Sequence, residues 1–270
     1  MYSYLGKMVI NMTNSVRYID LDYCIQQSIL YESSSGKFKI ISYKDSKNVR
    51  VKFIDTGYEI TSSLNAIRKG VIKDRLLPSV LGVGFIGGNN PSKIDGKHTK
   101  EYLVWRSMLT RCYDEKFKVK YPTYKHCFCS VSFNSYDWFY DWCNKQMSFG
   151  VDGFELDKDL LIKGNKVYSE DTCCFIPREI NVALIYNQTK KGNHPIGVSF
   201  NKVSNKFVAY VKKGEGSREY LGYFEDVSVA FLAYKEAKEA YLKELANKWK
   251  GKIDPRVYEA LIEWEINIDD

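Results

Sequence analysis

Polar and apolar residues alternate with the period of a β-strand near the N-terminus. Two such runs, 37–43 and 49–54, flank the polar segment 44–48 and predict a β-hairpin. A further short strand is expected at 58–61, and the glycines of LGVGFIGG (81–88) indicate tight turns or a close approach of the backbone. Residues 1–88 are therefore expected to form a small β-barrel.

The middle of the chain changes to helical spacing. Apolar residues at 104, 105, 108, 109 and 112 predict a helix over 101–113, and Trp138, Phe139 and Trp142 form the apolar stripe of a helix over 135–146. The following segment predicts a strand at 155–162, a loop, a strand at 173–176 and a helix at 177–186, where Pro177 suits the first turn. This order describes a ββα element.

The C-terminal part repeats the strand period three times and then becomes helical. Strands are expected at 196–200, 207–212 and 219–224, followed by a long helix at 227–249 and a last helix that Asp254 and Pro255 open. Polar stretches at 87–100 and 187–194 indicate linkers. The predicted fold is α+β and multidomain: a β-barrel over 1–88, a ββα domain with flanking helices over 89–190, and a three-stranded sheet packed on a long helix over 191–270.

Composition excludes several classes of protein. The 270 residues are 44% hydrophobic, which argues against wholesale disorder. No apolar run approaches the roughly 18 residues that a membrane span needs, and the N-terminal residues lack the pattern of a secretory signal. Seven cysteines are too sparse for a disulfide scaffold, and their odd number leaves one unpaired. A cytoplasmic location is therefore expected.

Charge is distributed unevenly over the C-terminal part. The chain carries a net charge of +7; residues 191–218 have 6 basic and 1 acidic side chains, whereas 219–270 have 7 basic and 12 acidic ones. This polarity is expected if one face of the domain meets a polyanion such as DNA. The alternative is solvated charge without a partner. The 21 tyrosines, 14 phenylalanines and 5 tryptophans add aromatic rings that can stack on bases.

Four short motifs follow one another in the C-terminal segment: Gly197-Val198, Lys206-Phe207-x-Ala209, Leu221-Gly222-x-Phe224 and Ala230-x-x-Ala233-Tyr234. Through these residues the segment resembles the plant APETALA-two/ethylene-response-factor DNA-binding domain. The resemblance implies a sheet that enters the major groove of DNA, as other β-sheet readers do. The family's groove-facing positions fall on Ser199, Asn201 or Lys202, Tyr210, Lys212, Arg218 and Tyr220. The alternative is a module for protein contacts or stability.

The predicted ββα element contains four short motifs: Leu156-Asp157-Lys158-Asp159, Gly164-Asn165-Lys166, Cys173–Pro177 and Ile180-Asn181. Through these residues the middle segment resembles a divergent HNH, or ββα-metal, nuclease. The resemblance implies catalytic residues Asp157, Asp159, Asn165 and Asn181. In this assignment Asp157, Asp159 and Asn181 bind Mg²⁺ or Mn²⁺, and Asn165 orders the loop.

This resemblance has one clear departure from the family pattern. The base histidine has no counterpart, because His98, His126 and His194 all lie outside the element. The alternatives are a nuclease fold retained only as a DNA-binding scaffold, and ordinary solvated aspartates.

Further motifs extend beyond the ββα element: Trp105-x-x-Met108-Leu109-x-Arg111-Cys112-Tyr113, Pro122-Thr123-Tyr124, Leu156-Asp157-Lys158-Asp159 and Gly164-Asn165-Lys166-x-Tyr168-Ser169. With these motifs, nearly the whole chain is similar to tailed-phage proteins described as HNH-type or homing endonuclease-like. The resemblance implies a phage protein that binds double-stranded DNA in the host bacterial cytoplasm and hydrolyses its phosphodiester bonds with a metal. The alternatives are an inactive DNA-binding regulator or host-takeover protein, and an interaction protein with a host protein partner.

The cysteines give a poor zinc signature. Cys127-Phe128-Cys129 is C-x-C and Cys173-Cys174 are adjacent, whereas structural zinc sites use C-x₂₋₄-C pairs. Buried apolar thiols are therefore favoured over structural Zn²⁺.

Overall fold

The computed structural model describes residues 21–184, 194–214 and 218–270, and it divides into two compact units. Unit 1 comprises Met1–Lys97 with Asn134–Asp137, and unit 2 comprises His98–Phe133 with Trp138–Asp270. The model is α+β with several sheets, as predicted. Both predicted domain boundaries, after 88 and after 190, lie inside a unit, and the three-domain division stays a prediction.

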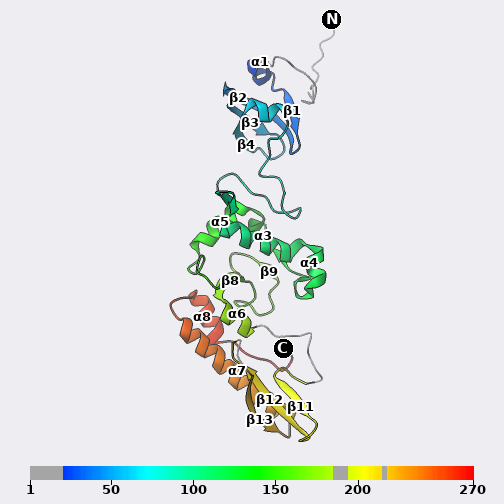
Figure 1. The fold of residues 1–270 in the computed structure, drawn as a ribbon, viewed down its shortest axis with the longest axis vertical. Coiled ribbons are helices and arrows are strands. Elements are labelled where there is room, and N and C mark those ends of the chain that lie inside the picture. The colour runs from blue at the N-terminus through cyan, green and yellow to red at the C-terminus, as the bar shows by residue number, and fades with distance from the viewer. Residues whose placement is uncertain (1–20, 185–193, 215–217) are drawn as a thin grey trace. The chain divides into compact units, whose positions relative to one another are not determined.

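Unit 1 is built on an open antiparallel sheet (Figure 1). Its strands follow one another in the order β1 (Leu30–Ser33), β2 (Gly36–Asp45), β3 (Asn48–Phe53) and β4 (Glu59–Ser62). The hairpin predicted from 37–54 is confirmed, but the predicted β-barrel is wrong for the described residues. The apolar face of the sheet packs against Cys24 of α1 (Leu21–Gln26) and Ile67 of α2 (Leu64–Arg68). Two helices thus bury the face that a closed barrel would have buried.

The segment predicted as a linker is ordered by one carboxylate. Asp137 accepts hydrogen bonds from the backbone N–H groups of Gly88, Asn89 and Asn90 at 2.8, 3.0 and 2.8 Å. The short strands β5 (Lys93–Ile94) and β6 (Lys97–His98) follow and pair with each other.

The first part of unit 2 contains the predicted ββα element. Strand β8 (Phe154–Asp157) pairs antiparallel with β10 (Cys174–Pro177), which leads into α6 (Arg178–Leu184). A parallel pair, β7 (Phe128–Cys129) with β9 (Val167–Tyr168), lies within the same unit. The flanking helices are α3 (Lys100–Tyr113), α4 (Glu115–Lys120) and α5 (Tyr136–Lys145), and short 3₁₀ turns occupy Pro122–Tyr124 and Ser132–Asn134. Predicted helix residues 185 and 186 and linker residues 187–193 lie outside the described residues.

The C-terminal strands and helices are confirmed. Strands β11 (Val198–Asn201), β12 (Lys206–Lys212) and β13 (Arg218–Phe224) form one antiparallel sheet. The long helix α7 (Val227–Trp249) runs from this sheet to α8 (Pro255–Ile262), as Figure 1 shows. No helix among the described residues is long and apolar enough to cross a membrane.

Helix α7 belongs to two hydrophobic cores. Its first half packs Ala230 and Tyr234 against the sheet. Its second half packs Leu242 and Leu245 in a separate core with residues of β10, α6 and α8. The helix therefore joins the sheet to the ββα element by burial rather than by a polar linker.

Gly197, at the entry to β11, permits the closest approach between the sheet and α7. Its φ of +78° lies in the left-handed region that favours glycine. A Cβ atom at this position would overlap the ring of Tyr234 on α7.

We expect Gly197→Ala to destabilise the fold more than Gly251→Ala. Gly251 has a similar φ of +76° but nothing within 4 Å of its Cβ position, so it shares the backbone strain of about 1–2 kcal/mol without the overlap. Displacing the Tyr234 ring should add about 1–3 kcal/mol at Gly197. Urea unfolding of both variants measures the difference, and equal losses would contradict the proposed contact.

Candidate functional site

The β11–β13 sheet of unit 2 presents one face to α7 and the other to solvent. Ala209 and Val211 of β12 belong to the core that the sheet shares with α7. Successive side chains of a strand point to opposite faces, and the strand pairing then assigns the remaining positions to the second face. We call this surface the open face; its members are Ser199, Asn201, Lys206, Tyr210, Lys212, Arg218, Tyr220 and Tyr223, with Val208 buried among them at 2% exposure.

The structure brings together six of the positions predicted to bind DNA. Ser199, Asn201, Tyr210, Lys212, Arg218 and Tyr220 all belong to the open face. Lys202, the other predicted position, is exposed in the turn between β11 and β12. DNA contact by these residues stays a prediction, but their shared surface is a property of the fold.

Positive charge gathers at one end of the open face without matching acids. Lys212 and Arg218 are directly opposite each other on β12 and β13, and both are exposed. Among the described residues, neither of these two side chains forms an ion pair. Lys206 pairs with Glu225 at 2.7 Å, and that glutamate is 79% exposed. Because like charges opposite one another are unfavourable in a sheet, an anion bound at Lys212 and Arg218 would relieve their repulsion.

Tyrosine rings form a ladder along the open face. Tyr210 and Tyr220 have ring centroids 5.8 Å apart, and Tyr220 and Tyr223 have centroids 5.5 Å apart. Sequence reasoning missed Tyr223, because strict alternation from Tyr220 would place residues 222 and 224 on this face. A bulge between Ala209 and Tyr210 shifts the pairing by one residue and brings Tyr223 to it. The glycine at 222 was the available signal.

Asn201 is engaged within the protein. Its Oδ1 accepts hydrogen bonds from the backbone N–H groups of Val203 and Ser204 at 2.9 and 3.1 Å. Its Nδ2 donates to the hydroxyl of Tyr223 at 3.3 Å. The side chain therefore shapes the β11–β12 turn and positions Tyr223.

The two aspartates of the ββα element have local partners. Asp157 Oδ1 accepts from the backbone N–H groups of Asp159 and Leu160 at 2.9 and 2.7 Å, which ends β8 five residues earlier than predicted and turns the chain. Burial, followed by repulsion from Asp159, raises the pKa of Asp157 to about 6. Asp159 forms an ion pair with the buried Lys158 at 3.1 Å.

The two asparagines of the element behave differently. Asn165 orders its loop, because its Nδ2 donates to the carbonyls of Lys158 and Val167, both at 2.7 Å. Asn181, on α6, donates to Glu155 Oε2 at 2.6 Å. No hydrogen bond joins Asn181 to Asp157 or Asp159 among the described residues. Sequence reasoning missed Glu155, the partner that strand and helix bring together.

The residues of the element do not fit the metal that the resemblance implies. One Asp157 oxygen is held by backbone N–H groups, Asp159 is paired with a lysine, and Asn181 is turned to Glu155. In the described part of the chain, no group of three His, Cys, Asp or Glu side chains is placed to hold a metal ion. We therefore derive no hydrolytic step through a cation.

Arg111 is a fixed cation beside this element that sequence reasoning did not assign. It lies 5.8 Å from the ring centroid of Tyr124 and contacts the hydroxyl of Tyr168. Burial lowers the pKa of Arg111, but Tyr168, Tyr124 and the Glu155 carboxylate outweigh burial and raise it. The guanidinium therefore stays charged close to Glu155.

All seven cysteines are buried and free. Burial raises the pKa of Cys173 to about 12, so its thiol is protonated at neutral pH. Cys112 and Cys129, from α3 and β7, hydrogen-bond to each other.

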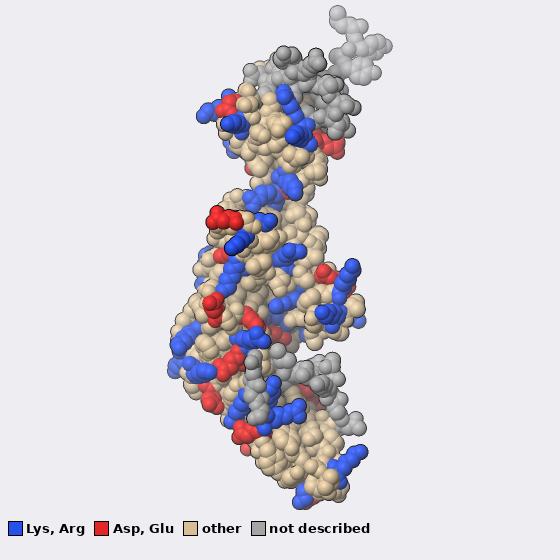
Figure 2. Space-filling view, in the orientation of Figure 1, with Lys and Arg blue, Asp and Glu red and all other residues tan. Residues whose placement is uncertain are grey.

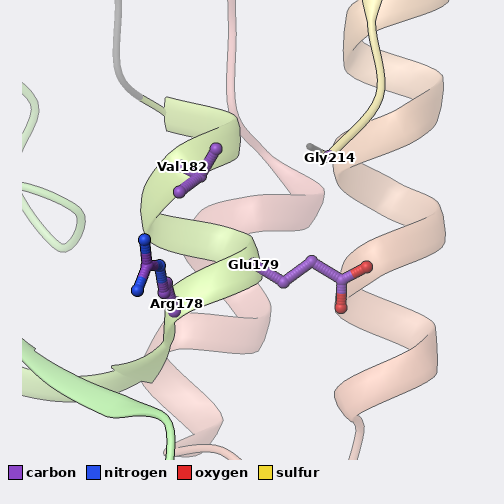
Figure 3. A pocket seen from close by; sticks show the side chains of 4 residues that line it. All are labelled: Arg178, Glu179, Val182 and Gly214. Atoms are coloured by element: carbon purple, nitrogen blue, oxygen red, sulfur yellow. The ribbon is translucent and has the colours of Figure 1, made fainter. Parts of the chain in front are cut away.

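A small cavity of about 220 Å³ lies between α6 and the end of β12 (Figure 3). Arg178, Glu179, Val182 and Gly214 line it. Glu179 extends toward α7, where it accepts hydrogen bonds from Lys248 and from the indole of Trp249. Its carboxylate thus supports the packing of α7 against α6.

Comparison with known proteins adds no assignment. The chain matches no family model, no curated protein and no solved structure.

One buried lysine lies beneath the open face. Lys238 of α7 is only 6% exposed, and its Nζ donates to the backbone carbonyl of Lys212 at 3.5 Å. Burial, followed by the charge of Lys212, lowers the pKa of Lys238 to about 8. The unfolded chain, with a lysine pKa of about 10.4, binds more protons than the fold between these values, so stability rises with pH there.

We expect Lys238→Met to be more stable than the wild type at about pH 7. The gain should shrink as the pH rises from about 8 towards 10, because the wild-type lysine is then neutral in the fold. Lys243→Met, at an exposed position of α7, provides the control and should show no such pH dependence. Thermal unfolding across this range measures both, and a pH-independent difference for Lys238→Met would contradict the assignment.

Proposed function

We propose that the chain is a DNA-binding protein whose open face holds the phosphate backbone of double-stranded DNA. The observation that supports this most directly is the pairing of Lys212 with Arg218 at one end of the open face, where neither forms an ion pair among the described residues, with Lys202 exposed in the β11–β12 turn. Phosphate contacts by Lys and Arg supply most of the non-specific affinity for DNA.

Helix α7, which packs on the other face of the sheet, carries both signs of charge. Its glutamates Glu236, Glu239 and Glu244 are interspersed with Lys235, Lys238, Lys243 and Lys248. Attraction to the open face would therefore orient the domain on a polyanion. In Figure 2, the visible surface of the β11–β13 region is mostly uncharged, with charged side chains at its edges.

As part of the same proposal, the chain is a phage protein of the HNH or homing endonuclease type that acts in the host bacterial cytoplasm. The resemblance of nearly the whole chain to such proteins supports this. A non-catalytic DNA-binding regulator fits the ββα element best, because its candidate ligands are engaged with other protein groups. A host protein partner belongs to the alternative in which DNA binding is vestigial.

Metal-dependent hydrolysis of DNA is the second candidate function. It is favoured by the pairing of β8 and β10 and by the Asn181–Glu155 contact, which bring strand and helix side chains together. Mg²⁺ or Mn²⁺ would supply charge neutralisation at the scissile phosphate. This candidate requires Asp157, Asp159 and Asn181 to exchange their present partners for the cation.

We expect Lys212→Ala with Arg218→Ala to weaken duplex binding and to flatten its dependence on salt. Each lost phosphate contact should reduce the slope of log K against log salt by about 0.9, or about 1.8 for the pair. Fluorescence anisotropy with a labelled duplex between about 50 and 200 mM salt measures both effects.

A matched control removes the same charge from the other side of the domain. Lys243→Ala with Lys250→Ala, both exposed on or at the end of α7, should leave the slope unchanged. Equal losses in the two double variants would mean that only net charge matters, and the open face would lose its role.

A plasmid-nicking assay separates the two candidate functions. We expect the wild-type protein to leave supercoiled plasmid intact in Mg²⁺ and in Mn²⁺. The reason is that the candidate metal ligands Asp157, Asp159 and Asn181 are not gathered around one point. Nicking that Asp159→Ala abolishes, with DNA affinity retained, would overturn the non-catalytic assignment. Nicking that survives in Asp159→Ala would place the activity elsewhere in the chain.

A further inference from the structure

The middle of the open face is aromatic rather than cationic. Tyr220 and Tyr223 are 51% and 49% exposed, although each ring contacts another ring of the ladder. Lys212 and Arg218 lie beyond Tyr210 and Tyr220, at one end of the paired strands. A nucleic acid held by these two cations therefore meets tyrosine rings along the sheet.

The open face carries few groups that can read the edges of paired bases. Direct readout in the major groove relies on Arg or Lys with guanine and on Asn or Gln with adenine. Asn201 is the one amide side chain of the open face, and its two polar atoms already bind Val203, Ser204 and Tyr223. Tyrosine rings offer large flat surfaces instead, which suit the faces of bases.

Faces of bases are accessible only where the bases are unpaired. Along a duplex strand they stack at a spacing of about 3.4 Å. The ring centroids of the ladder are 5.8 and 5.5 Å apart, which is wider than the spacing of stacked bases. Two bases that stack on neighbouring rings must therefore separate from each other. A strand that follows the ladder must be single-stranded and extended.

We propose that the tyrosine ladder of the open face binds the unpaired bases of a single-stranded DNA segment, while Lys212 and Arg218 hold its phosphates. This inference rests on the proposed DNA-binding function and deepens it, because it names the form of DNA that the centre of the face prefers. A duplex engages only the cations at the rim, whereas a nicked, gapped or melted site also engages the rings.

The experiment compares one sequence in two forms. A labelled oligonucleotide of about 20 nucleotides is titrated with the full chain, alone and annealed to its complement, and anisotropy gives both affinities. Stacking of a base on an aromatic ring contributes to affinity at each ring that it uses. Tyr220→Ala with Tyr223→Ala should therefore weaken single-strand binding at least about tenfold and change duplex binding less than about twofold.

Two further variants separate stacking from loss of structure. Tyr220→Phe with Tyr223→Phe keeps both rings and should retain single-strand affinity. Tyr43→Ala removes a similarly exposed tyrosine, 42% exposed, from the sheet of unit 1 and should change neither form. Circular dichroism of the alanine pair confirms that the sheet remains folded.

Each outcome bears on one of the two proposals. Wild-type binding to the duplex but not to the single strand would overturn the ladder and leave the DNA-binding proposal standing. Equal losses of affinity for both forms of DNA in the Tyr220→Ala, Tyr223→Ala variant would also overturn the proposed role of the tyrosine ladder. An unchanged affinity of this variant for the single strand would do the same. Failure of the wild type to bind either form would overturn the proposed function itself.

Discussion

The packing of α7 against the β11–β13 sheet is the contact on which the candidate surface depends. Ala230 and Tyr234 of the helix lie against Ala209 and Val211 of the central strand, and Gly197 lets the chain pass close to the Tyr234 ring. Small side chains on both elements allow the helix to approach closely, which buries the centre of one face of the sheet. The other face is left to solvent because a three-stranded sheet has no second layer to cover it.

Helix α7 also fixes the sheet to the ββα element. Leu242 and Leu245 continue into a core with Ile176, Ile180 and Val257, so α7 is held by the ββα element as well as by the sheet. This packing holds the cations of the open face in place, although their like charges repel one another.

Local sequence signals predicted most of the elements. The strands β2 and β3 and the span of α7 could be predicted, because burial of one side gives the sequence a regular repeat of apolar residues. Contacts between segments that are distant in the sequence could not be predicted from it. The barrel prediction failed because α1 and α2 cover the apolar face of the sheet, and nothing in the strands specifies what covers them. Tyr223 was missed because a bulge breaks the alternation, and Glu155 because its partner Asn181 is 26 residues away.

A lysine-acetylation footprint of the full chain, with and without DNA, tests the central claim most directly. The account holds that the sheet meets DNA with the face turned away from α7. Acetylation of Lys202 and Lys212 should therefore fall when DNA is bound, while acetylation of Lys243, exposed on α7, should not change. Protection of Lys243 without protection of Lys202 and Lys212 would contradict the account, as would an unchanged pattern at a DNA concentration that saturates binding.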